Sequence, residues 1–210
     1  MIVMGKLQSI RRDENEPNQP VSIGDRAFDN LAFIRETMER STSFTAVPGY
    51  GGILMGATAV VAAYIAHTQI YLRDWLVTWL VEAFLAFAIG LLAMWQKSKI
   101  AGTSLVSAPA RKFAFSFAPP LIVGVAIVLG LWRYEYYYVM PPVCILCYGA
   151  AVVCGGAFSV RVVPLMGWCF IALGALAFAL PTSYGNLMMG ASFGLLHIVF
   201  GAIIARRYGG

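Results

Sequence analysis

Six long apolar runs dominate this chain of 210 residues, and they restrict the folds that it can adopt. The runs cover approximately residues 49–70, 75–95, 113–132, 140–160, 162–180 and 184–205. A helix needs ~20 apolar residues to cross ~30 Å of bilayer hydrocarbon. The pattern therefore predicts an all-α fold, a polytopic transmembrane helical bundle with six spans. Five spans and one re-entrant run remain an alternative, because only a short turn at Arg161 joins the fourth and fifth runs.

The distribution of charge divides the chain into three regions. Only 12% of the residues are charged, and seven of the ten acidic residues lie before Phe44. Soluble domains carry about 25% charged residues, so the chain after Phe44 has the composition of a protein embedded in lipid. We expect a flexible N-terminal tail at 1–21, a cytoplasmic amphipathic helix and linker at 22–43, and the transmembrane bundle at 44–210.

The amphipathic helix is predicted from apolar residues that recur at helical spacing between Ser22 and Arg40. These residues are Ala27, Phe28, Leu31, Ile34 and Met38. Ser22 with Asp25 three positions later resembles a capping box. Beside a membrane anchor, such a helix lies in the lipid interface, packs against the cytoplasmic ends of the bundle or binds a partner.

Lysine and arginine predict the orientation of the bundle. Successive segments between the predicted spans lie on alternate sides of the membrane. Thirteen of the fifteen basic residues fall on one side, and only Arg73 and Arg133 fall on the other. The positive-inside rule then predicts a multi-pass inner-membrane protein with both termini in the cytoplasm. The basic residues flank apolar runs instead of forming one face, so no nucleic-acid partner is expected.

Small residues and prolines mark where helices approach or bend. Gly52 with Gly56 and Gly190 with Gly194 form two GxxxG patterns. We expect them to pack helices within the chain in preference to forming a dimer. The dipeptide at 119–120 (Pro-Pro) should kink or interrupt the third span.

Cys144 and Cys147 form a CxxC pair at the start of the fourth span. Two thiols at this spacing lie on one helical turn and can close a disulfide. The pair, preceded by Pro141 and Pro142, resembles the disulfide bond formation protein B family of membrane thiol oxidases. This resemblance implies outer-face thiol–disulfide exchange with quinone as the cofactor. The chain departs from that family in lacking a second cysteine pair in an outer loop and a basic residue shortly after the motif.

A second resemblance covers most of the chain. It is carried by four segments, SFTAVPGYGGILMG, APARKFAFSFAPP, GAFSVRVVPLMG and GLLHIVFGAIIARRYGG. They are similar to a group of small polytopic bacterial membrane proteins to which no function has been assigned. The resemblance implies a membrane bundle and no particular activity.

Two further polar residues lie inside predicted spans, Glu82 and His197. An ionisable group in the membrane is costly and is a candidate functional residue. Glu82 is therefore either the centre of a small transporter or a polar clamp between helices. His67 and His197 are predicted at different depths, which argues against a haem held by two histidines.

Cys154 and Cys169 are equidistant from a turn centred between Arg161 and Val162. An antiparallel hairpin would place them at one depth, and His197 could share that layer. Cysteine and histidine together suit a soft metal, although each is more often a packing residue. We predict no metal site, with this trio as the remote alternative.

These observations lead to three functional hypotheses. The first is a non-enzymatic accessory or scaffold component that acts through helix packing, with the lipid bilayer and another membrane protein or a second copy as partners. The second is an outer-face thiol–disulfide oxidoreductase that uses Cys144 and Cys147, and the third is a small transporter centred on Glu82. No phosphate loop or HExxH motif occurs, and no cofactor is expected apart from quinone under the second hypothesis.

Overall fold

The computed structural model describes residues 27–34, 44–102 and 104–209. The chain divides into two units, with the boundary between Met38 and Glu39. In the first unit, residues 27–34 are helical, within the predicted amphipathic helix. Its large apolar side chains are exposed: Phe28, Leu31, Phe33 and Ile34. The predicted tail, the predicted capping box and Met38 lie outside the described residues.

The second unit confirms the all-α polytopic bundle, since six helical segments are long and apolar enough to cross a membrane. The first five are α2 (Gly49–Thr68), α3 (Leu72–Ile100), α4 (Ala108–Arg133), α5 (Met140–Gly156, preceded by the 3-10 turn η1, Tyr137–Val139) and α6 (Val162–Ala179). The sixth is composite, built from η2 (Thr182–Tyr184), α7 (Gly185–Met189), the π-helical η3 (Gly190–Leu196) and α8 (His197–Tyr208). Because α5 and α6 are separate helices, six spans describe the chain better than five.

Three spans are longer than predicted, and α3 and α4 extend the most. α3 continues to Ile100, and α4 begins at Ala108, where Pro109 occupies the first turn and needs no hydrogen-bond acceptor. α4 also runs without a break through Pro119 and Pro120, so the predicted interruption does not occur. Neighbouring helices and local adjustments tolerate proline in membrane helices.

The bundle has two ends that differ in charge. We call the end where α2 begins and α3 ends the basic end, because it carries seven of the described Lys and Arg residues: Lys97, Lys99, Arg111, Lys112, Arg161, Arg206 and Arg207. At this end Phe44 donates its N–H to the carbonyl of Phe158 at 2.7 Å and forms a single bridge with Ser159. Lys97 donates to the carbonyl of Val47 at 3.0 Å. The chain is thus fixed where it enters α2.

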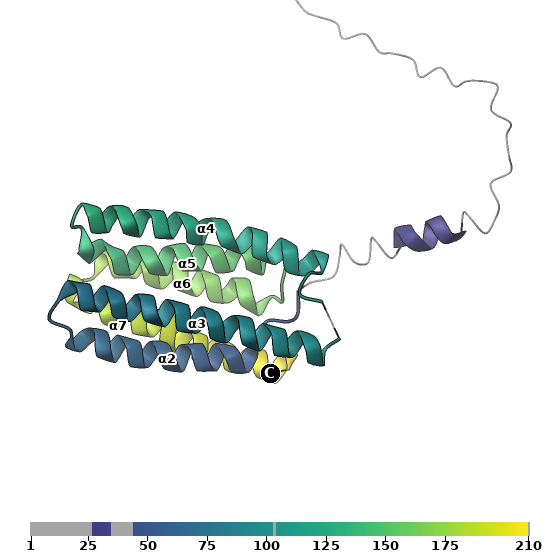
Figure 1. Ribbon diagram of the computed structural model, residues 1–210, viewed down its shortest axis with the longest axis horizontal. Coiled ribbons are helices and arrows are strands. Elements are labelled where there is room, and N and C mark those ends of the chain that lie inside the picture. The colour runs from purple at the N-terminus through teal and green to yellow at the C-terminus, as the bar shows by residue number, and fades with distance from the viewer. Residues whose placement is uncertain (1–26, 35–43, 103, 210) are drawn as a thin grey trace, which may run out of the picture. The chain divides into compact units, whose positions relative to one another are not determined.

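α2 and the sixth span touch through glycine. α2 runs antiparallel to the sixth span, and α4, α5 and α6 lie side by side (Figure 1). A methyl group on Gly56 would lie 2.5 Å from the carbonyl oxygen of Gly194, and one on Gly201 would lie 2.8 Å from that of Gly49. Both predicted GxxxG patterns therefore serve contacts within the chain, because Gly190 also meets α2 at Ala63.

Candidate functional sites

The most enclosed polar site joins α5 to the sixth span. The Tyr148 hydroxyl lies 2.8 Å from Nε2 of His197, and either ring can donate, depending on the histidine tautomer. The aromatic rings of Phe170 and Phe193 surround the pair, with centroids 4.9 Å and 5.1 Å from that of Tyr148. His197 is buried at 6% exposure. The hydrogen bond between Tyr148 and Nε2 of His197, enclosed by aromatic rings away from water, holds two spans in register.

Sequence reasoning identified His197 but not Tyr148. The signal was available, because a tyrosine in the middle of an apolar run must find a hydrogen-bond partner when it is buried. Phe193 and His197 are four residues apart in the sixth span, and their rings are stacked with an interplanar angle of 15°.

Glu82 takes part in a second contact between spans. Oε1 of Glu82 lies 2.9 Å from the hydroxyl oxygen of Thr58 on α2, and the carboxyl is buried at 7% exposure. The same hydroxyl lies 2.9 Å from the carbonyl oxygen of Met55. The hydroxyl has one proton, which it donates to one of these two oxygens or shares between them. The contact forms a polar clamp between α2 and α3.

Substitutions at Glu82 test this clamp. Glu82→Gln keeps a side-chain oxygen that accepts from Thr58 and should leave the free energy of unfolding within about 0.5 kcal/mol of the parent. Glu82→Leu removes the contact and should lower it by about 0.6–1.7 kcal/mol, as for other hydrogen bonds between membrane helices. Thermal unfolding in detergent measures both. Abolition of a proton-linked flux in proteoliposomes by Glu82→Gln would instead favour the transporter hypothesis.

The CxxC pair lies within α5 and not at its first residue. Pro141 and Pro142 occupy the first turn, and Cys144 and Cys147 follow on the next, both as free thiols. Cys144 packs against the main apolar core. Cys147 packs against α4, where a methyl group on Gly124 would lie 2.8 Å from its Cβ. Both thiols therefore contribute to helix contacts.

This placement predicts low thiol reactivity. In intact membranes, a membrane-impermeant maleimide should label Cys144 and Cys147 at least about 100-fold more slowly than a Ser183→Cys control, because a thiol enclosed by apolar groups forms little thiolate. Ser183 lies in an exposed joint at the end of the bundle opposite the basic end. Mass spectrometry of the digested protein gives both rates. Equal rates would reopen the hypothesis of thiol–disulfide exchange.

The structure does not bring Cys154, Cys169 and His197 together. A methyl group on Gly156 would meet Pro164, and one on Gly174 would meet Leu146, so the α5–α6 hairpin is centred near Val160. The predicted centre between Arg161 and Val162 was wrong, because α5 ends at Gly156.

The corrected register separates the two cysteines. Cys154 is level with Met166, and Cys169 lies ~5 Å further along the bundle. Cys154 is exposed, whereas Cys169 packs against the core. Within the described part of the chain, no three His, Cys, Asp or Glu side chains are grouped so that they could hold a metal ion.

At the end opposite the basic end, a cavity of about 310 Å³ opens between three joints of the chain. His67 lines it, together with Gln69, Thr182 and the pair Trp75 and Asn186, whose Nε1 and Oδ1 atoms are 2.6 Å apart. His67 is therefore near one end of the bundle, while His197 packs level with Gly52 and Gly56 near the middle. The two histidines do not share a site, as the sequence predicted.

No protein-family model, no curated protein and no solved structure matches this chain.

Proposed function

We propose that this protein is a non-enzymatic component of a bacterial inner membrane, with cytoplasmic termini, that acts as an accessory or scaffold subunit through helix packing. One observation carries the proposal: the side chains that could take part in catalysis or proton transfer are engaged in contacts between spans. Thr58 holds Glu82, His197 holds Tyr148, and Gly124 packs against Cys147.

The outer helices supply surfaces for such a role. In the most apolar part of α3, 11% of the residues are buried, and in that of α4, 6% are buried. In the span that contains α5, the buried share is 50%. Large apolar side chains cover both faces, among them Leu85 on α3 and Val125 on α4. The excess of Lys and Arg at the basic end supports a cytoplasmic position for that end.

Photo-crosslinking in living cells tests the proposal. A benzophenone amino acid replaces Leu85 or Val125, one at a time, and the membranes are irradiated before purification. An accessory subunit should give one discrete crosslinked product of constant mass from at least one of the two faces. A product with twice the mass of the chain would identify a second copy as the partner.

Trp79 supplies the internal control. It lies on α3 but is buried at 8% exposure, so a photoprobe there should react only within the chain. If the probes at Leu85 and Val125 crosslink lipid alone, and the purified protein is a monomer, the accessory role is excluded.

A further inference from the structure

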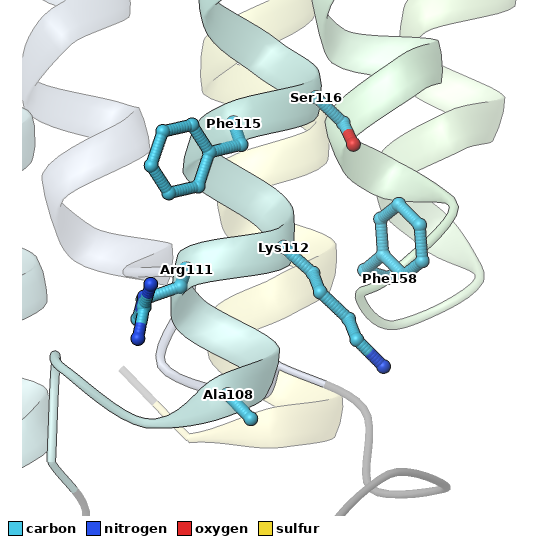
Figure 2. A pocket seen from close by; sticks show the side chains of 6 residues that line it. All are labelled: Ala108, Arg111, Lys112, Phe115, Ser116 and Phe158. Atoms are coloured by element: carbon cyan, nitrogen blue, oxygen red, sulfur yellow. The ribbon is translucent and has the colours of Figure 1, made fainter.

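A basic groove lies along the first two turns of α4, at the basic end of the bundle. It has a volume of about 370 Å³ and is lined by Ala108, Arg111, Lys112, Phe115, Ser116 and Phe158. Figure 2 shows Lys112, Ser116 and Phe158 on one side of the α4 ribbon, and Arg111 and Phe115 on the other. The groove thus combines two cations, a hydroxyl and two aromatic rings.

No acidic side chain in the described part of the bundle neutralises these cations. Its three carboxylates are Asp74, Glu82 and Glu135. Asp74 begins α3 and Glu135 follows α4, so both lie at the opposite end, and Glu82 is held by Thr58. Arg111 and Lys112 are exposed and therefore free to bind an anion.

The rings indicate that the ligand also has an apolar part. Phe115 is 72% exposed and Phe158 38% exposed, and both lie where the apolar span begins. Aromatic side chains at this depth lie between lipid headgroups and acyl chains. The groove extends ~12 Å from Ala108 to Ser116, from the charged end toward the apolar part of the helix.

We propose that this groove binds the headgroup of an anionic phospholipid, with the phosphate at Arg111 and Lys112 and the acyl chains along Phe115 and Phe158. Basic pockets at one face of a membrane bundle recognise lipid headgroups in this manner. The inference does not depend on the accessory role, because a lipid site is compatible with any activity of the bundle.

Native mass spectrometry of the full-length protein in mild detergent provides the test. Phosphatidylglycerol, which has an anionic phosphate and hydroxyl groups, is compared with phosphatidylcholine. The double variant Arg111→Gln with Lys112→Gln should bind phosphatidylglycerol about 30-fold more weakly than the parent, with no change for phosphatidylcholine. The matched control, Arg206→Gln with Arg207→Gln, removes the same charge at the same end and should bind like the parent.

Several results would overturn the proposal. They are a groove variant that binds phosphatidylglycerol as the parent does, a control variant that loses as much affinity, and displacement of the lipid by inorganic phosphate. The last result would identify a site for free phosphate. All four substituted residues are exposed, and equal unfolding temperatures of the variants would exclude misfolding as the cause.

Discussion

Gly56→Ala is expected to lower the free energy of unfolding by about 3 kcal/mol, near the upper end for overpacked sites. The added methyl group would lie 2.5 Å from the carbonyl oxygen of Gly194 and 2.8 Å from the backbone N of Ile198. These atoms belong to the backbone of the sixth span, so no side-chain rotation relieves the overlap. α2 and the sixth span must separate, and they lose dispersion contacts along their length. Thermal unfolding in detergent micelles measures the effect.

Gly130→Ala provides the control for this experiment. Gly130 lies on α4, and nothing is within 4 Å of an added methyl group there. The same substitution should leave stability unchanged or raise it by about 0.5–1 kcal/mol, because alanine loses less conformational freedom in a helix. If both variants lost stability equally, close packing against the sixth span would not be the cause of the loss at Gly56.

Phe170→Ala should lower the free energy of unfolding by about 3–5 kcal/mol, the range for a large cavity in a core. Phe170 is fully buried, and its ring packs against Tyr148, Phe193 and His197. Its loss leaves a void beside the only hydrogen bond that joins Tyr148 to His197. The same measurement, combined with the near-ultraviolet circular dichroism of the aromatic cluster, reports both stability and ring packing.

Phe178→Ala is the matched control, since it removes the same atoms from the same helix. Phe178 lies eight residues further along α6 and is 53% exposed. Lipid can fill the space that its ring leaves, so stability should stay within about 0.5 kcal/mol of the parent. An equal loss at both positions would show that the face around Phe178 is also packed against protein.

The approximate position of a residue along the bundle could be predicted from the sequence, whereas the exact register of neighbouring helices and the rotation about each helix axis could not. The apolar runs gave six spans to within a few residues, because ~20 residues must cross the hydrocarbon whatever their neighbours are. The separation of His67 and His197 followed for the same reason. Rotation depends on which side chains pack against neighbouring helices, and apolar residues on all faces carry no periodic signal.

Tyr148 and Cys154 illustrate this limit. The hydroxyl of Tyr148 indicates that it needs a partner if it is buried, but the run at 140–160 does not show that Tyr148 faces inward and Cys154 outward until the partner helices are known. The predicted register of the α5–α6 hairpin was also wrong, because α5 ends at Gly156 although the apolar run continues to Val160. The contact between Thr58 and Glu82 could not be predicted either, because it depends on which helix faces Glu82.

The π-helical stretch at Gly190–Leu196 has a consequence for how this chain can change in length. A π-turn holds one residue more than an α-turn, and such turns arise within α-helices at single positions. Deleting one residue here would restore α-helical geometry and leave the direction of the residues after it unchanged, so Gly201 would still face Gly52. Deleting one residue from a regular turn, as in α8, would rotate everything after it by ~100°. The widened turn is therefore the place inside the sixth span where the loss of one residue is best tolerated.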